Sequence, residues 1–247
     1  MAELAASRYD AVVFDMDGVI TDTARIHAQA WKRMFDAYLR ARSGAADAAF
    51  EPFTDEDYRL YVDGKHRDDG VESFLSARGI QLARGGPADP PDRETVWGLA
   101  NRKDSDFQEV LKHEGAKVFP SSVAFVHELQ SHGVATAIVS ASKNCRRILD
   151  AAGVGDLFSV RVDGLVSEEL GLPGKPSPAT FLEAARRLGA EPSRAVVVED
   201  AIAGVEAGRR GEFALVVGVD RTGQAAELKA VGADVVVADL AELQVVP

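Results

Sequence analysis

Short apolar runs alternate with longer amphipathic stretches over most of the chain. The runs are rich in Val, Ile and Ala, which predicts buried strands, and the stretches between them predict helices. This alternation is typical of a parallel sheet covered by helices on both faces, so the predicted class is α/β with a doubly wound, mostly parallel sheet. The predicted strands are 11–15, 134–140, 158–162, 195–199, 214–219 and 234–237, and the predicted helices between them include 121–132, 144–152, 178–188 and 203–210.

One interval breaks the alternation. Residues 22–115 contain no convincing strand, and helices are expected at 55–62, 69–78 and 92–114, with a Pro/Gly-rich link at 85–91. We therefore predict an α/β core (1–21 and 116–247) and a helical cap (22–115) inserted after the first strand. Open α/β sheets bind ligands at the carboxyl ends of their strands, so this cap is expected to act as a lid. One apolar stripe at helical spacing predicts core packing, and its residues are Ile26, Ala30, Trp31, Met34, Phe35 and Tyr38.

Composition narrows the classes of function. The chain has 247 residues, 46% of them hydrophobic, which is enough for a substantial core. Its net charge of −11 argues against nucleic acid or anionic membranes as partners, and an anionic substrate would need a local cationic pocket. The single cysteine, Cys145, excludes an internal disulfide; with no signal-peptide pattern or membrane-spanning run, a cytoplasmic protein is expected. Nothing in the sequence requires a dimer, so we expect a monomer.

The first predicted strand ends in two acids. Asp15 and Asp17 stand at positions i and i+2, so an extended chain points both side chains to one face. Two neighbouring carboxylates repel each other, and burial strengthens the repulsion. A divalent cation or a shared proton removes the conflict. The pair therefore predicts Mg²⁺ binding and proton transfer beside a carboxylate nucleophile.

Three other strand ends carry polar groups. The segment 140–144 is rich in hydroxyls and leads into a helix, which suits phosphate. Lys175 stands in a proline-stiffened loop, and Glu199 and Asp200 close another buried strand. Each has an ordinary alternative: Ser140 as a strand-end cap, Lys175 as a solvated charge and Asp200 as a helix N-cap. Taken in order, however, the four sites offer a nucleophile, a phosphate clamp, a cation and metal ligands.

This order of motifs resembles the haloacid dehalogenase-like superfamily of phosphotransferases, and within it the β-phosphoglucomutase-like family. The resemblance spans nearly the whole chain. It is carried by residues 14–23, His27, Trp31, Gly64, Arg67, Arg102, Lys103, and the segments 140–144, 175–178 and 199–204.

The resemblance implies roles for the core residues. Asp15 would be the nucleophile that forms an aspartyl phosphate, and Asp17 the general acid and base. Mg²⁺ would be held by the Asp15 carboxylate, the Asp17 main-chain carbonyl and Asp200, with Glu199 nearby or holding a water. The transferring phosphoryl group would be held by Ser140, the Ala141 amide and Lys175.

A mutase also needs a binding site for the second phosphate of the sugar bisphosphate. The resemblance assigns it to Arg67, Ser142, Lys143 and Asn144, places Thr23 at the hinge, and makes His27 and Lys103 the pair that couples lid closure to Asp17. Arg67 has an alternative as a surface residue paired with Asp68 or Asp69, and His27 as a packed or solvated side chain. Lys65, His66 and the long link at 85–91 differ from the family's cap.

The expected activity is interconversion of β-D-glucose 1-phosphate and glucose 6-phosphate, with glucose 1,6-bisphosphate as the activating intermediate. A phosphatase using the same Asp15 phospho-enzyme with water as acceptor is the alternative. A non-enzymatic phosphate-responsive domain would be expected to lack a catalytic carboxylate, yet Asp15, Asp17, Glu199 and Asp200 are all present.

Overall fold

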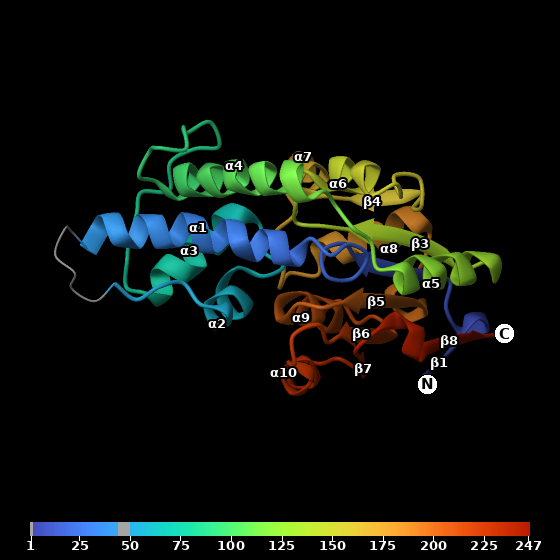
Figure 1. Ribbon diagram of the computed structural model, residues 1–247. Coiled ribbons are helices and arrows are strands. Elements are labelled where there is room, and N and C mark those ends of the chain that lie inside the picture. Colours follow the sequence, from blue (N-terminus) through green and yellow to red (C-terminus); the bar gives the residue numbers. More distant parts are fainter. Residues whose placement is uncertain (1, 44–49) are drawn as a thin grey trace. The chain divides into compact units, whose positions relative to one another are not determined.

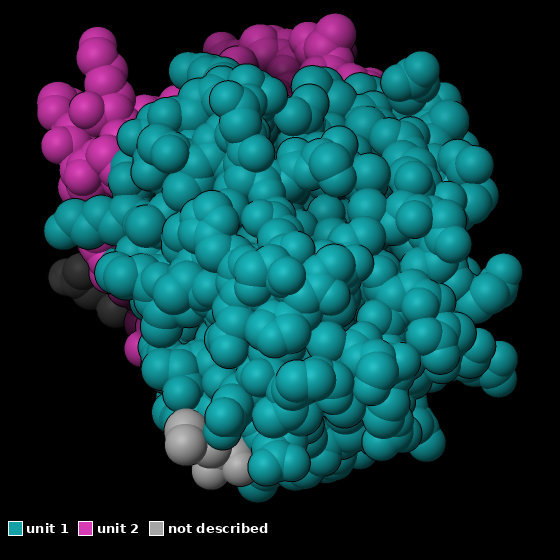
Figure 2. Space-filling model, turned by 90° about the vertical axis from the view of Figure 1, so that its right-hand side faces the viewer, with its two compact units in different colours: residues 1–23, 116–247 teal, residues 24–115 magenta. Residues whose placement is uncertain are grey.

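The computed structural model describes residues 2–43 and 50–247. The chain divides into two compact units, residues 1–23 with 116–247 and residues 24–115 (Figures 1 and 2). Each unit has its own cluster of buried hydrophobic residues. Over the described ranges, every helix is too short or too polar to cross a membrane.

The first unit is built on a six-stranded sheet with the order β4-β3-β2-β5-β6-β7, and all neighbours are parallel. In register, Phe14 pairs with Ile138 on one side and Val198 on the other. The predicted α/β class with a parallel sheet is confirmed. The strands are β2 (Ala11–Asp15), β3 (Ala135–Val139), β4 (Val160–Val162), β5 (Ala195–Glu199), β6 (Leu215–Val219) and β7 (Val235–Val237).

The strand order has a switch point between β2 and β5. The chain winds outward from β2 through β3 to β4, then returns to the other side of β2 for β5, β6 and β7. In open parallel sheets, the crevice outside the carboxyl ends of the strands at such a point binds ligands. Asp15 ends β2 and Glu199 ends β5, so the topology places both acids there.

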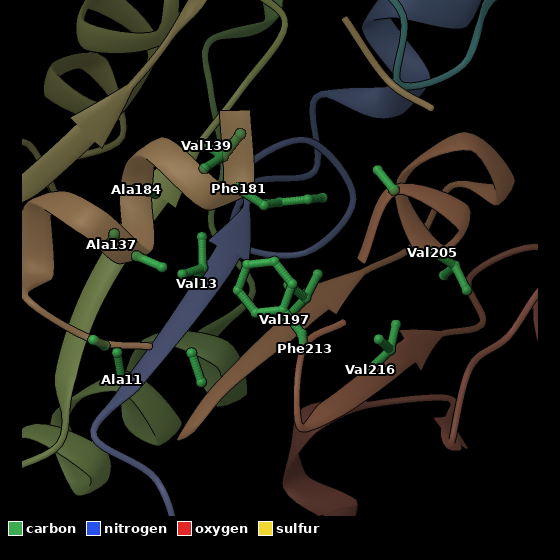
Figure 3. Packing of buried hydrophobic residues seen from close by; sticks show 14 of the residues in the cluster. Ala11, Val13, Ala137, Val139, Phe181, Ala184, Val197, Val205, Phe213 and Val216 are labelled. Carbon is green, nitrogen blue, oxygen red and sulfur yellow. The ribbon is translucent and has the colours of Figure 1, made fainter. Parts of the chain in front are cut away.

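Helices cover both faces of the sheet because adjacent strand residues point to opposite sides. Val13 packs with Val197 and with Phe181 of α8 (Figure 3). The Phe14 ring faces the other way, with its centroid 6.3 Å from that of Phe125 in α5. The helical elements of this unit are α5 (Pro120–Ser131), α6 (Cys145–Ala151), α7 (Gly164–Leu170), α8 (Ala179–Leu188), α9 (Ile202–Arg210), α10 (Ala225–Ala230) and the 3₁₀ turns Ala6–Arg8, Pro192–Arg194 and Leu240–Glu242.

A second, two-stranded sheet was not predicted. β1 (Ala2–Ala5) pairs in parallel with β8 (Leu243–Val246). Leu4 and its partner Val245 are buried, so the pairing adds apolar contacts as well as main-chain hydrogen bonds.

The second unit contains α1 (Ala24–Ser43), α2 (Asp55–Asp57), a π-helical turn (Tyr58–Val62), α3 (Arg67–Ala77) and α4 (Val96–Glu114). The predicted apolar stripe of α1 is confirmed as buried. Its rings join an aromatic cluster, in which Phe35 lies 5.3 Å from Trp31 and 4.2 Å from Phe74 between ring centroids. This cluster is the core of the unit.

Two helix predictions in this unit were wrong in their bounds. The helix predicted at 92–114 begins at Val96, because Thr95 is the N-cap and its side chain accepts the Gly98 N–H. The helix predicted at 55–62 divides into a short α-helix and a π-helical turn, in which the Asp63 N–H donates to the Tyr58 carbonyl at 3.0 Å.

Candidate active site

The end of β2 turns back on itself. The Gly18 N–H donates to the Thr21 carbonyl at 2.7 Å, and the Thr21 N–H donates to the Met16 carbonyl at 2.9 Å. Gly18 has a φ of +84°, a left-handed conformation that favours glycine. This turn keeps Asp17 close enough to Asp15 for their charges to interact.

Lys175 connects two of the acidic strand ends. Its ammonium group donates to Oδ1 of Asp15 and to Oε1 of Glu199, and the residue is only 4% exposed. Burial opposes the charged form, but attraction by the two carboxylates outweighs it and raises the pKa of Lys175 above its usual value. Lys175 is thus a fixed buried cation at neutral pH, and the alternative of a solvated loop charge is wrong.

Asp15 is under opposing electrostatic influences. Burial is the largest and raises its pKa well above the usual value; Lys175 lowers the pKa, and repulsion from Glu199 and Asp17 raises it again. A further positive charge beside the carboxyl would favour the ionised form, which a nucleophile requires.

The acidic cluster offers a place for that charge. Asp15, Glu199 and Asp200 are buried, and each contributes one carboxylate oxygen to a group whose members all lie within 4.8 Å of one another. Lys175 is a single buried cation shared by Asp15 and Glu199, so ionisation of both carboxyl groups leaves negative charge that a bound cation would offset. Hard divalent cations prefer carboxylate oxygens, so these residues fit a divalent cation in charge and in donor type.

Two glycines make room for these carboxylates. A Cβ on Gly18 would lie 1.7 Å from Oδ2 of Asp200, and one on Gly204 would lie 1.7 Å from Oε1 of Glu199. The other oxygen of Glu199, Oε2, accepts the Ala201 N–H at 2.7 Å. Since both Glu199 oxygens accept hydrogen bonds from the protein, this residue orients Lys175. Ala201 is the N-cap residue of α9, so the N-cap alternative for Asp200 is wrong.

The Asp17 carboxylate is held by hydroxyl groups. Thr23 donates to Oδ1 of Asp17, and Ser140 donates to Oδ2 at 3.4 Å. Thr23 is itself fixed by Thr21, whose Oγ1 lies 2.6 Å from its own. Both threonines are fully buried, so the carboxylate is held in one orientation.

The segment after β3 is organised by its own serines. The Ser142 N–H donates to the Ser140 hydroxyl and the Asn144 N–H to the Ser142 hydroxyl, both at 3.1 Å. The strand-end cap interpretation of Ser140 is therefore confirmed, and it is compatible with a ligand contact. Lys143 pairs with Glu168 of α7 at 2.8 Å, so part of its charge is compensated.

In the second unit, His27 and Lys103 are neighbours. Nζ of Lys103 lies 2.7 Å from Nδ1 of His27, and the His27 ring stacks on Phe107 with centroids 4.0 Å apart. Lys103 is buried, with its ammonium 4.9 Å from the centroid of the Trp31 ring. His27 is therefore packed, as the alternative expected, and it also contacts the lysine that the resemblance assigns to it.

Arg67 begins α3 and reaches toward α4. Its Nη2 donates to Oδ1 of Asn101 at 3.0 Å, and its Nη1 lies 3.6 Å from Oδ1 of Asp104. Asp68 instead accepts from Arg84 at 2.8 Å. The local alternative, in which Arg67 pairs with Asp68 or Asp69, is wrong.

The structure thus brings the predicted residues together in groups that belong to separate units. One group, in the first unit, surrounds the ends of β2, β3 and β5; the others, in the second, are the His27–Lys103 pair and the surroundings of Arg67. Gly18, Thr21 and Gly204 lie within the motifs at 14–23 and 199–204 but were assigned no role from the sequence, and Asn101 was not identified at all. The visible signals were a threonine two residues before Thr23 and glycines beside the two acidic pairs.

The fold and the site define a doubly wound α/β protein with a buried acidic cluster at the switch point of its sheet. A family model described as haloacid dehalogenase-like hydrolase matches residues 9–211. The chain belongs to the haloacid dehalogenase-like family.

Two relatives are similar to this chain over almost their whole length. The β-phosphoglucomutase of Mycobacterium tuberculosis (strain CDC 1551 / Oshkosh) is 50% identical over 237 residues, which cover 94% of this chain and 90% of the relative. The β-phosphoglucomutase of Bacillus subtilis (strain 168) is 32% identical over 235 residues, with 94% and 91% covered. Among solved structures, the β-phosphoglucomutase from Clostridium difficile has a TM-score of 0.74 at 23% identity, with 96% and 93% covered, which shows the same fold.

Proposed function

We propose that the chain is a β-phosphoglucomutase that interconverts β-D-glucose 1-phosphate and glucose 6-phosphate. The observation that carries this proposal is the 50% identity, over nearly the full length, to the M. tuberculosis protein of that name. The buried contact between Asp15 and Lys175 supports a phosphoryl-transfer chemistry at the same site. The substrate is a small phosphorylated sugar, and glucose 1,6-bisphosphate is the intermediate that charges the enzyme.

Asp15 is the proposed nucleophile. Its carboxylate oxygen attacks phosphorus while the bond between phosphorus and the sugar oxygen breaks, which leaves an aspartyl phosphate. Asp17 donates a proton to the departing sugar oxygen. In the reverse transfer, Asp17 takes the proton from the sugar hydroxyl that attacks the aspartyl phosphate. The hydrogen bond from Thr23 supports this role because it fixes the direction of the Asp17 carboxyl.

Lys175, Ser140 and the Ala141 amide are proposed to hold the oxygens of the transferring phosphoryl group. Phosphoryl transfer depends mostly on positioning and on neutralisation of charge, so fixed donors in a buried site contribute most of the rate. Lys175 suits this role because two carboxylates hold its ammonium in place.

The divalent cation is proposed to be Mg²⁺. Asp15, the main-chain carbonyl of Asp17 and Asp200 would hold it, and Glu199 lies beside them. When bound, Mg²⁺ would offset negative charge on the phosphoryl oxygens and favour ionised Asp15. Glu199 differs from a simple metal ligand because its oxygens already accept hydrogen bonds from Lys175 and the Ala201 N–H, so its main role is to orient Lys175.

The second phosphate of the sugar bisphosphate is assigned to Arg67, with Ser142, Lys143 and Asn144. A guanidinium group binds phosphate through two parallel hydrogen bonds, which suits a residue that must select a doubly phosphorylated substrate. The unit formed by residues 24–115 would act as the cap, and the boundary after Thr23 is the proposed hinge. The His27–Lys103 pair would couple cap closure to the protonation of Asp17.

A single assay tests the function. The protein is given β-D-glucose 1-phosphate, Mg²⁺ and a trace of glucose 1,6-bisphosphate, and glucose 6-phosphate and free phosphate are followed together. Formation of glucose 6-phosphate without matching phosphate release is expected. Steady phosphate release without isomerisation would replace the mutase with the phosphatase alternative.

Two further properties are proposed with this function. A monomer is expected, and sedimentation would test it. A cytoplasmic location is expected from the cysteine content, and cell fractionation would test it.

A further inference from the structure

The segment 83–95, between α3 and α4, has no helix or strand but is firmly attached to α4. The Val96 N–H donates to the Ala83 carbonyl at 3.0 Å, and the Trp97 N–H donates to the Arg84 carbonyl at 3.1 Å. The first amides of a helix have no partner within the helix. Here the segment supplies those partners, so its path is fixed to the start of α4.

Asp89 organises the inside of the segment. Its Oδ2 accepts from the Thr95 hydroxyl at 2.6 Å and from the Gly86 N–H at 3.2 Å, and its Oδ1 accepts from Arg93 at 2.9 Å. The Thr95 hydrogen bond is the largest influence on the pKa of Asp89 and holds it below its usual value. The packing is close, because a Cβ on Gly98 would lie 2.0 Å from the Arg93 carbonyl oxygen. The segment therefore has one defined conformation.

Asn101 connects this segment to Arg67. Its Nδ2 donates to the Pro87 carbonyl at 3.0 Å and to the Asp89 carbonyl at 2.8 Å. Its Oδ1 accepts from Nη2 of Arg67 at 3.0 Å. An amide has two N–H donors on nitrogen and an acceptor oxygen, so a flipped amide would face its oxygen toward two carbonyl oxygens. The segment thereby dictates that the Asn101 oxygen faces Arg67.

The guanidinium of Arg67 is hydrogen-bonded by an amide and has one carboxylate at longer range. The acceptor that orients the guanidinium is a neutral amide, and the carboxylate of Asp104 lies 3.6 Å away, beyond ordinary hydrogen-bond distance. The Trp97 ring centroid is 5.9 Å from the guanidinium carbon. Nε of Arg67 has no hydrogen-bond partner among the described residues. The hydrogen bond that directs the guanidinium therefore comes from a neutral amide, and Asp104 compensates its charge only through a longer ion pair.

We propose that Asn101 is a positioning residue, fixed by the 83–95 segment, that orients Arg67 for the second phosphate of the sugar bisphosphate. This inference rests on the proposed function, because the ligand of Arg67 is the substrate named there. The long link at 85–91 therefore contributes to binding: its carbonyl groups fix Asn101, Asn101 orients Arg67, and Arg67 binds the second phosphate.

The test is a double-mutant cycle of Asn101→Ala and Arg67→Ala with glucose 1,6-bisphosphate. Asn101→Ala is expected to raise KM for the bisphosphate about tenfold while kcat falls by no more than about threefold. In the Arg67→Ala background, the same substitution is expected to change KM by less than about twofold, because its effect acts through Arg67. Equal effects in both backgrounds, or an unchanged KM in Asn101→Ala, would overturn the inference.

Two companion variants separate positioning from folding. Ser105→Ala removes an exposed hydroxyl on α4 that donates only to the Asn101 main-chain carbonyl, and its KM is expected to match wild type. Asn101→Asp keeps an acceptor for Arg67 but loses both donors to the segment and adds a competing charge. Its KM is expected to rise at least as much as in Asn101→Ala; a wild-type KM would refute the role of the neutral, segment-bound amide.

Binding is also measured by calorimetry with glucose 1,6-bisphosphate in the absence of divalent cations, so that phosphoryl transfer is suppressed. If wild type fails to isomerise β-D-glucose 1-phosphate, the proposed function fails, and the ratio of Kd values still decides the role of Asn101. About tenfold weaker binding in Asn101→Ala supports the inference, and equal binding contradicts it.

Discussion

Replacement of Lys175 by methionine isolates the charge that this buried lysine supplies. Methionine fills similar space but leaves Asp15 and Glu199 without their shared cation. Loss of one partner from a buried ion pair costs about 3–5 kcal/mol of stability, because the other charge stays buried and uncompensated. The side chains are 2%, 8% and 0% exposed, which puts them in that class. At about 2–4 °C per kcal/mol for a chain of this size, Tm is expected to fall by about 6–20 °C at pH 8 without metal.

The pH dependence of this loss has a definite sign. Burial raises the pKa of Asp15, and Lys175 is the neighbour that lowers it, so the substitution raises that pKa further. A carboxyl whose pKa is higher in the folded state takes up a proton on folding, and stability is lost as pH rises through the folded value. The deficit of Lys175→Met relative to wild type is therefore expected to be largest at pH 8 and to shrink toward pH 5.

Differential scanning calorimetry with a chelator at pH 5 and pH 8 measures the fall in Tm and its dependence on pH. The matched control is Lys229→Met, because the Lys229 ammonium is exposed and donates to the main-chain carbonyl of Asp234. This control is expected to change stability by less than about 0.5 kcal/mol at either pH. The reasoning would be refuted if Lys175→Met were as stable as wild type at pH 8, or if its loss of stability were the same at pH 5 and pH 8.

Three further predictions concern the same site. Gly18→Ala places a Cβ 1.7 Å from Oδ2 of Asp200 and should weaken divalent-cation binding, measured by titration, about tenfold. The control is Gly153→Ala, where φ is +74° and nothing lies within 4 Å of the added Cβ. It should bind the cation as wild type does and lose only about 1 kcal/mol of stability to backbone strain. Asp17→Asn should lower turnover by about 10²–10⁴ with little change in cation affinity, since only its main-chain oxygen is proposed to bind the ion; lost affinity would contradict this. A divalent cation at about 100 times its Kd should stabilise wild type by about 2.7 kcal/mol at pH 8, measured by thermal melts. The stabilisation should be smaller at pH 5, because a proton on Asp15 competes with the cation. Equal stabilisation at the two pH values would contradict this prediction.

The central strands were predictable because their signal is local. β2 and β5 are five-residue apolar runs that are buried on both faces, and their predicted bounds agree with the structure at both ends. The acids that close them are read directly from the sequence. What brings Asp15 and Glu199 together is the adjacency of β2 and β5 at the reversal of strand order, and this order was not predicted from the sequence.

The features that were missed depend on three-dimensional contacts that leave no periodic pattern in the sequence. β1 and β8 pair across almost the whole sequence, and neither is a long apolar run. Asn101 is one amide on a polar helix face, and its role depends on where the carbonyls of Pro87 and Asp89 lie. The start of α4 was placed too early because Asp92 and Glu94 are acidic residues suited to a first helical turn, whereas the Asp89–Thr95 contact holds them outside the helix.

The cations proposed for phosphate binding differ in what already compensates them. Lys143 faces Glu168, and Lys175 is held by two carboxylates, so both bring less net charge to a phosphate than an isolated ammonium would. Arg67 is oriented by the neutral amide of Asn101. In a chain of net charge −11, an anionic substrate is repelled at long range and must be captured by local positive charge. Asp104 already compensates part of the Arg67 charge from 3.6 Å, and a neutral acceptor at the position of Asn101 preserves the remainder, whereas a second carboxylate there would orient the guanidinium equally well and compensate it further.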